Sequence, residues 1–132
     1  MTMTLTQFIK TYNGKKVDFD GKFGIQCVDL YRQYCKDVLG VKQSPAVEGA
    51  KDIIDNPGEL KITWDGVNAD YSRGDILIWD KTASNKYGHV AILVALYNTK
   101  YFIVLEQDGF AQDGCKLAFR SRENLRGCLY KG

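Results

Sequence analysis

The 132-residue sequence contains a single histidine, and no two of its four cysteines have the CxxC spacing that is common in zinc sites. A zinc centre is therefore not expected. The first ten residues, MTMTLTQFIK, lack the basic segment, apolar stretch and small-residue cleavage site of a secretory signal. We expect a protein that is made in the cytoplasm and whose thiols are free. The cysteines are Cys27, Cys35, Cys115 and Cys128.

Long apolar runs and a strong net charge are also missing. The longest apolar stretch, residues 90–97, is far shorter than the roughly 18 residues of a membrane span, so none is expected. The net charge of +2, from 18 basic and 16 acidic side chains, gives no indication of a nucleic-acid partner. With 45% apolar and 26% charged residues, the composition is that of a globular protein. The length predicts one domain over residues 1–132, and we expect a monomer.

The first half of the chain has helical periodicity. The apolar residues Leu5, Phe8 and Tyr12 predict a short helix that begins with a Thr4–Gln7 capping box and ends at residues 13–14. A second helix is predicted from Cys27 to Gly40. The Ser44–Pro45 pair is typical of a helix start and predicts a third helix that ends before Pro57.

The second half has the composition of strands. Residues 75–80, 90–97 and 101–106 are rich in β-branched and aromatic side chains, with a tight turn expected at residues 98–99. Residues 115–119 and 127–130 are candidates for two more strands. Helices followed by consecutive antiparallel strands predict an α+β fold, with the N-terminal helices packed on a C-terminal antiparallel sheet.

Cys27 has the surroundings of a nucleophile. It opens a helix, where unpaired backbone N–H groups stabilise a thiolate, and it follows a loop with two glycines. The side chain of Gln26 and these N–H groups could bind the oxyanion of an attacked carbonyl. The alternative is a buried thiol on the apolar side of the helix, and this interpretation suits Cys35 better.

His89 is the only imidazole that could take a proton from that thiol. It begins a predicted strand, and the preceding Gly88 would let a substrate backbone approach. Because the next strand returns in a hairpin, its last residue, Glu106, should lie beside His89 and orient the ring. Asp108 would face the same side and contact the imidazole or the substrate. The alternatives are an exposed loop histidine and a solvated carboxylate at a strand end.

An acidic loop precedes and follows Cys27. Asp18, Asp20 and Asp29 stand at positions one, three and twelve of an EF-hand numbering, but the pattern departs from an EF-hand at its glycine position. Two interpretations remain open. One is a related calcium loop completed by backbone carbonyls of Lys22 and Gly24, and the other is a turn whose aspartates cap nearby N–H groups.

Three segments of the sequence together resemble one known family. They are DFDGKFGIQCVDLYRQY, GDILIWD with YGHVAIL, and VLEQDG. The family is the CHAP domain, a cysteine- and histidine-dependent amidohydrolase or peptidase. The resemblance is closest to bacteriophage endolysins and tail-associated lysins and covers nearly the whole chain. It implies a papain-like fold and cleavage of an amide bond in peptidoglycan, by endopeptidase or N-acetylmuramoyl-L-alanine amidase action. It also implies work on the bacterial cell wall, after release or within a virion, with a separate wall-binding domain or virion protein as a partner.

The resemblance also implies roles for individual residues. Cys27 falls on the family nucleophile, His89 on the general base, Glu106 on the residue that orients the histidine, and Gln26 on the adjacent glutamine. Many relatives have asparagine where this chain has Asp108. The calcium-binding pattern of the family is matched, and the metal set it implies is Asp18, Asp20, Lys22, Gly24 and Asp29.

Two other functions compete with wall hydrolysis by a phage lysin. The acidic loop and the change at Asp108 would also suit a non-enzymatic, calcium-dependent wall-binding module. A contact-dependent toxin or conjugation-associated hydrolase would use the same chemistry as a lysin, and the sequence does not separate it from one.

Overall fold

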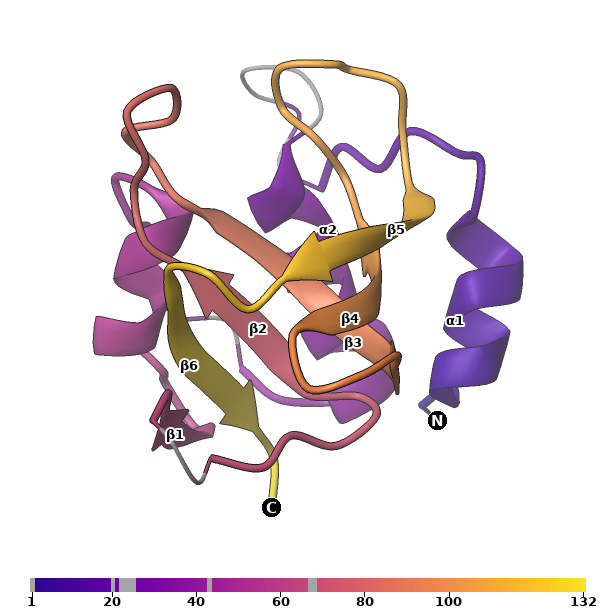
Figure 1. Cartoon of the computed structure of the whole chain (residues 1–132). Coiled ribbons are helices and arrows are strands. Elements are labelled where there is room, and N and C mark those ends of the chain that lie inside the picture. The colour runs from indigo at the N-terminus through magenta and orange to yellow at the C-terminus, as the bar shows by residue number, and fades with distance from the viewer. Residues whose placement is uncertain (1, 20, 22–25, 43, 67–68) are drawn as a thin grey trace.

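The computed structural model describes residues 2–19, 21, 26–42, 44–66 and 69–132 and has an α+β architecture in which helices cover one face of an antiparallel sheet (Figure 1). The helical elements are α1 (Leu5–Tyr12), α2 (Cys27–Tyr34), a π-helical turn η1 (Cys35–Leu39) and a 3-10 helix η2 (Ala50–Asp55). The strands are β1 (Lys61–Trp64), β2 (Ile76–Trp79), β3 (His89–Leu96), β4 (Tyr101–Glu106), β5 (Lys116–Ser121) and β6 (Leu125–Tyr130). None of the helices in the described ranges is long and apolar enough to cross a membrane.

The first two helices begin and end where the sequence predicts. In α1, the Gln7 N–H donates to Thr4 Oγ1 at 3.1 Å and the Thr4 N–H donates to Gln7 Oε1 at 2.8 Å, so the capping box is confirmed. The second helix starts at Cys27, continues through η1, and ends at Gly40, whose left-handed conformation (φ 62°) is typical of a helix C-terminus.

The predicted start of the third helix at Ser44–Pro45 is wrong. The helix begins only after Gly49, whose N–H is capped by the Asp52 carboxylate at 3.1 Å. The Ser44 hydroxyl instead lies 2.9 Å from the Tyr31 hydroxyl, and the carbonyls of Ser44 and Pro45 accept hydrogen bonds from Arg32. This segment is therefore held against α2 by side-chain contacts that compete with helix formation.

The strands form one sheet in the order β1-β6-β2-β3-β4-β5, and every neighbouring pair is antiparallel. The five predicted strands are confirmed within a few residues at their ends. β1 was not predicted, because it is only four residues long and pairs only with β6 at the sheet edge. The predicted turn at residues 98–99 joins β3 and β4.

The sheet is strongly curled. β5 and β6 are separated by only residues 122–124, yet β2, β3 and β4 lie between them in the sheet order. The Trp79 indole N–H of β2 donates to the Ser121 carbonyl at the end of β5 at 2.9 Å and so links two strands that are not neighbours in the sheet. In Figure 1, β5 accordingly crosses in front of the middle strands.

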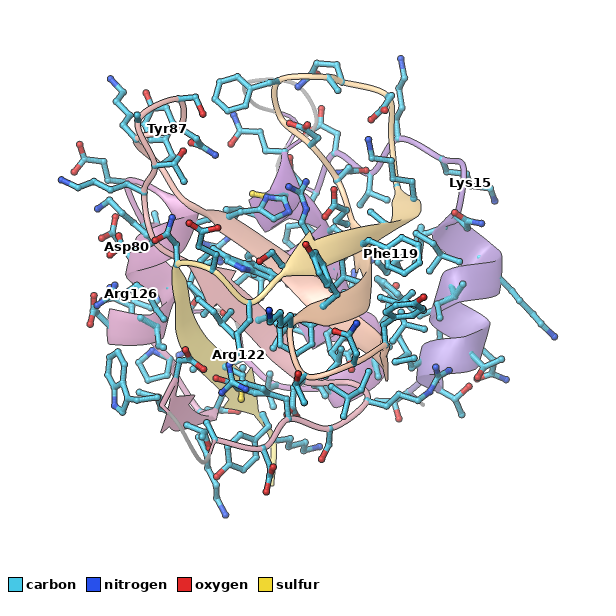
Figure 2. The ribbon with its side chains drawn as sticks, in the orientation of Figure 1. Lys15, Asp80, Tyr87, Phe119, Arg122 and Arg126 are labelled. Carbon is cyan, nitrogen blue, oxygen red and sulfur yellow. The ribbon has the colours of Figure 1, made fainter. Side chains whose placement is uncertain are left out.

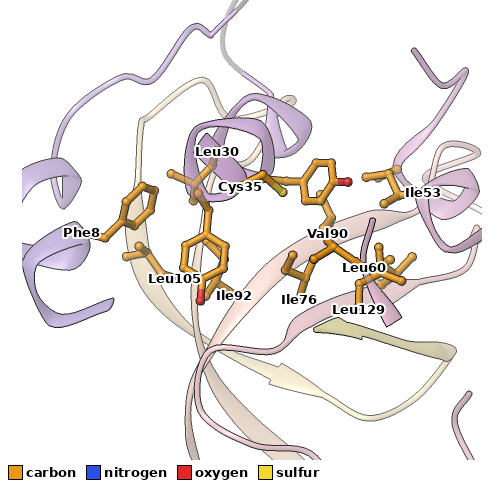
Figure 3. Close-up of a cluster of buried hydrophobic side chains, with 14 of the residues drawn as sticks. Phe8, Leu30, Cys35, Ile53, Leu60, Ile76, Val90, Ile92, Leu105 and Leu129 are labelled. Atoms are coloured by element: carbon orange, nitrogen blue, oxygen red, sulfur yellow. The ribbon is translucent and has the colours of Figure 1, made fainter. Parts of the chain in front are cut away.

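The two faces of the sheet carry separate hydrophobic cores. The larger core lies between the sheet and the helices and includes Phe8, Leu30, Ile76, Ile92 and Leu105 (Figure 3). The smaller core fills the inside of the curl, and its members include Leu77, Trp79, Leu93, Phe102 and Val104. Because side chains alternate along a strand, His89, Glu106 and Arg120 belong to the inner face.

Gly88 lies in the β2–β3 connection, packs against η2 and leaves no room for a side chain. Its φ is +74°, and an added Cβ would lie 2.4 Å from the Trp79 carbonyl oxygen and 2.7 Å from Lys51 Cβ. The close approach to Gly88 that was expected of a substrate backbone is thus made by other parts of the protein. We expect Gly88→Ala to destabilise the fold by about 3 kcal/mol, through backbone strain and overpacking.

Thermal unfolding of Gly88→Ala measures this effect, which corresponds to a drop in the melting midpoint of roughly 10 °C. Gly66→Ala is the matched control, because no atom of the residues that the structure describes lies within 4 Å of a Cβ added there. Equal midpoints for the two variants would contradict the assignment of Gly88 to close packing.

Candidate active site

Cys27 is the first residue of α2, and its side chain is half-buried. The helix start is built by a local exchange between Gln26 and Asp29: the Gln26 N–H donates to Asp29 Oδ2 at 2.9 Å, and the Asp29 N–H donates to the Gln26 carbonyl at 3.1 Å. All four cysteines are free thiols, as expected, and the other three are buried. Cys27 is therefore the thiol placed to react with a molecule from solution.

His89 begins β3 and lies opposite Trp79 of β2. Its ring centre is 5.8 Å from that of Trp79, and its side chain is 14% exposed. Nε2 lies 3.2 Å from Glu106 Oε1, and the Cys27 thiol lies close enough to the ring to interact with its charge. Because an imidazole has two ring nitrogens, Nδ1 is the one left for a partner other than Glu106.

Glu106 ends β4 and is 1% exposed. Arg120 of β5 binds both of its oxygens, through Nε to Oε1 and through one terminal nitrogen (Nη2) to Oε2, each at 2.5 Å. A bidentate guanidinium holds a carboxylate in one orientation. Three neighbouring strands thus supply a continuous chain of contacts from Arg120 through Glu106 and His89 to Cys27.

These contacts determine the protonation states in the site. Burial disfavours the charged form of His89, but hydrogen bonds and charge interactions with Cys27 and Glu106 outweigh burial and raise its pKa from 6.5 to about 9. Burial likewise disfavours ionised Glu106, but Arg120 and His89 outweigh it and lower the pKa of the carboxyl from 4.5 to about 2. Near neutral pH the site therefore holds an imidazolium beside the ionised carboxylate of Glu106.

Two cavities adjoin this set of residues. A cavity of about 360 Å³ is lined by His89, Trp79 and Arg120, and a larger one of about 780 Å³ is lined by Gln26, Gly88, Tyr87 and Phe110 among others. Figure 2 shows Tyr87 on the β2–β3 connection above Asp80, which lines the smaller cavity. A chain-like substrate therefore has room beside His89 in one cavity and beside Gln26 in the other.

Asp108 lies in the turn after β4. Its Oδ1 accepts the Phe110 N–H at 2.8 Å, and its carbonyl accepts the Gln112 N–H at 3.0 Å. Among the hydrogen bonds of the described residues, none joins its carboxylate to His89. The predicted contact of Asp108 with the imidazole or with substrate stays a prediction.

The predicted metal ligands lie only partly within the described residues. Asp18 Oδ1 accepts the Gly21 N–H at 3.0 Å, as expected for an aspartate that caps a turn, and Asp29 caps α2 and is 4% exposed. Asp20, Lys22 and Gly24 fall outside the described residues. Within the described ranges, no group of three or more His, Cys, Asp or Glu side chains could hold a metal ion.

Sequence reasoning missed Arg120 and Gln107. Arg120 is a basic residue in a strand, an ordinary surface pattern, and only its register with β4 places it on the inner face. Gln107 follows Glu106 directly and is 0% exposed. The sequence did contain a signal for Gln107, since a polar side chain that continues a buried strand needs hydrogen-bond partners in the interior.

A thiol at a helix N-terminus, an imidazole on the sheet and a buried carboxylate behind it define a papain-like class of α+β protein. The CHAP domain model matches residues 16–108, and the chain belongs to this family. Among curated proteins it is similar to endolysin PlyTW of Staphylococcus phage Twort (strain DSM 17442 / HER 48), with 32% identity over 106 residues that make up 76% of this chain and 22% of that protein.

Solved structures show the same fold. The wild-type endolysin LysIME-EF1 superimposes with a TM-score of 0.78 at 20% identity, covering 98% of this chain and 64% of that one. Ly7917 with the hydrolyzing product of MDP superimposes with a TM-score of 0.66 at 19% identity, covering 96% of this chain and 62% of that one. The chain thus spans about a fifth of its curated relative and less than two thirds of these two chains.

Proposed function

We propose that this chain is a peptidoglycan hydrolase that cleaves an amide bond through a Cys27 acyl-enzyme, as an endopeptidase or an N-acetylmuramoyl-L-alanine amidase. The observation that carries the proposal is the contact chain Cys27–His89–Glu106 beside two open cavities. The family, the endolysin names of its relatives and the product complex of Ly7917 support peptidoglycan as the substrate. The protein would act on the bacterial cell wall.

The proposed reaction is acyl transfer in two stages. In the first, the Cys27 thiolate attacks the amide carbonyl, a C–S bond forms, and the carbonyl oxygen becomes an oxyanion held by the Cys27 N–H and the Gln26 side chain. The His89 Nδ1 proton passes to the amine nitrogen as the C–N bond breaks, which leaves a thioester. In the second, neutral His89 takes a proton from water, the hydroxide attacks the thioester, and the thiolate departs from a carboxylic acid product.

Arg120 is proposed as a positioning residue in this reaction. By binding both oxygens of Glu106 it keeps the carboxylate ionised and directed at His89 Nε2, which in turn keeps Nδ1 facing the thiol. Asp108, whose charge lies near Arg120, is proposed to contact substrate from the turn after β4.

Mass spectrometry of purified peptidoglycan after incubation with the protein tests the proposal. New fragments should carry one new amine and one new carboxyl group, and their masses identify the bond as the sugar–peptide amide or a peptide bond. Retention of the protein on the wall without new fragments would contradict hydrolysis and favour the binding-module alternative.

The raised pKa of His89 predicts how activity depends on pH. The imidazolium that protonates the leaving amine persists up to about pH 9, so kcat/KM should fall as the pH rises through about 9. The stability of the fold depends on pH in the same direction. The contribution of charged His89 to the free energy of unfolding is complete below its ordinary pKa of 6.5 and is lost as the pH rises through about 9. A fall of kcat/KM that begins already near pH 6.5 would contradict the pairing of His89 with Glu106.

We also propose that the acidic loop binds one calcium ion, through Asp18, Asp20 and Asp29 with the carbonyls of Lys22 and Gly24. Asp18 and Asp29 fit this ion chemically, because carboxylate oxygens are the ligands calcium prefers. Bound calcium would neutralise the charges of these carboxylates.

Isothermal titration of chelator-treated protein should give one calcium site, and calcium should raise the melting midpoint because it binds the native state. Asp20→Ala should abolish both effects, whereas Asp113→Ala, at an exposed carboxylate paired with Lys116, should change neither. Absence of both heat and midpoint shift in the wild type would refute the calcium site.

A further inference from the structure

Gln107 is a fully buried amide at the end of β4, next to Glu106. Its Oε1 accepts the Val17 N–H at 2.7 Å, and its Nε2 donates to the Val17 carbonyl at 2.8 Å and to the Gln26 carbonyl at 2.9 Å. The oxygen and both N–H groups of the amide therefore each take part in a hydrogen bond. A buried amide satisfied in this way has one orientation, since rotation would break several hydrogen bonds at once.

These contacts connect the two halves of the candidate site. The Gln107 backbone continues the strand that carries Glu106, while its side chain reaches the residue before Cys27. The chain near Val17 is anchored a second time, because Gly14 and Lys15 exchange backbone hydrogen bonds with Cys115. The carbonyl of Gln26 is thus bound to a firmly held part of the sheet.

The Gln26 carbonyl belongs to the same peptide group as the Cys27 N–H. A peptide group is planar and trans, so its C=O and N–H point in opposite directions, and fixing one fixes the other. Gln107 and the Asp29 N–H both donate to this carbonyl, at 2.9 and 3.1 Å. The N–H of the first helical residue has no acceptor within the helix.

We infer that Gln107 is a positioning residue that aims the Cys27 N–H at the oxyanion formed when a substrate carbonyl is attacked. The inference rests on the proposed function, because only acyl transfer forms this oxyanion. Hydrogen bonding at the carbonyl end also polarises the peptide group and makes its N–H a stronger donor. Gln107 touches neither the sulfur nor the imidazole in this role.

The role predicts a split between two reactions of the same thiol. Cleavage of an amide passes through an oxyanion, whereas alkylation of Cys27 by iodoacetamide displaces iodide at a saturated carbon and forms none. Loss of the Gln107 contact should therefore slow the first reaction and leave the second nearly unchanged. A merely structural role would slow both, since a displaced helix start moves the sulfur away from His89.

The test uses Gln107→Met, which keeps the length of the side chain and removes its hydrogen bonds, and Gln107→Glu, which keeps an acceptor for the Val17 N–H. On a soluble peptidoglycan fragment, kcat should fall by about 10- to 100-fold with KM unchanged, less than the loss of a whole oxyanion donor. The rate of alkylation by iodoacetamide should change by less than about twofold.

Tyr34→Phe is the matched control, because it removes a hydrogen bond from a buried side chain to a backbone carbonyl, Gly74 O at 2.8 Å, away from the site. It should leave kcat unchanged. Wild-type kcat in the Gln107 variants, or a parallel loss of alkylation and cleavage, would overturn the inference, whereas absence of cleavage by the wild type would refute the proposed function itself.

A measurement on the wild-type protein covers the case in which the Gln107 variants do not fold. The side-chain amide protons of Gln107 should exchange slowly with solvent and show a coupling across the hydrogen bond to the Gln26 carbonyl in NMR spectra. Rapid exchange of these protons would overturn the inference without any substitution.

Discussion

Replacing Cys27 by alanine is expected to lower the rate of peptidoglycan cleavage by roughly 10³-fold or more, because no other group in the site can form the acyl-enzyme. The fold should be retained, since Cys27 is only half-buried at the first turn of α2. The release of new amine groups from purified cell walls measures the effect. Binding to the walls should be kept, because the cavities are not changed.

Cys35→Ala is the matched control for this experiment. It also removes a thiol from the same helical segment, but Cys35 is 1% exposed in the larger core, whereas Cys27 is only half-buried. This variant should lose about 1 kcal/mol of stability and keep its activity. Equal cleavage by wild type and Cys27→Ala would refute the acyl-enzyme mechanism.

Glu106→Gln is expected to have the second-largest effect, a loss of activity of about 100-fold or more. The amide keeps the size of the side chain but removes the charge that holds the imidazolium, and burial then lowers the pKa of His89. The same change leaves Arg120 without its ionic partner. Because Arg120 is 38% exposed, the expected loss of stability is about 2 kcal/mol, below the range for a fully buried pair.

Two measurements check this prediction. NMR titration of the single histidine should show its pKa fall from about 9, and the alkaline limb of the activity profile should move with it. Asp113→Asn, which removes an exposed carboxylate from the loop before β5, is the control and should change neither. An unchanged His89 pKa in Glu106→Gln would show that the carboxylate does not determine the charge of the ring.

Most of the fold could be predicted from local patterns. The capping box at Thr4, the helix that opens at Cys27 and the turn between β3 and β4 all depend on neighbouring residues, and the structure confirms them. The start of the third helix was wrong because Ser44 and Pro45 bond to α2 rather than to their own chain neighbours. β1 was missed because an edge strand of four residues depends on β6 for its partners.

The residues of the candidate site also differ in whether they could be predicted from local patterns. The approach of Glu106 to His89 could be predicted because a β-hairpin is short-range geometry, whereas the pairing of Cys27 with His89 was implied by the resemblance to a CHAP domain. Arg120 could not, because its side chain faces Glu106 only in the observed register, and a shift of one residue would turn it outward. Gln107 required the position of Val17, which is distant in sequence.

By itself, the sequence determined where the helices and most strands lie, since helix capping, strand alternation and hairpin return are local properties of the chain. Its resemblance to a CHAP domain then indicated which thiol, imidazole and carboxylate would react. Only the tertiary structure decided how these groups are charged and held. The ion pair of Arg120 depends on the register between β4 and β5, and the hydrogen bonds of Gln107 join the end of β4 to segments that are distant in sequence. Such contacts depend on register and burial, which arise only when the whole chain packs.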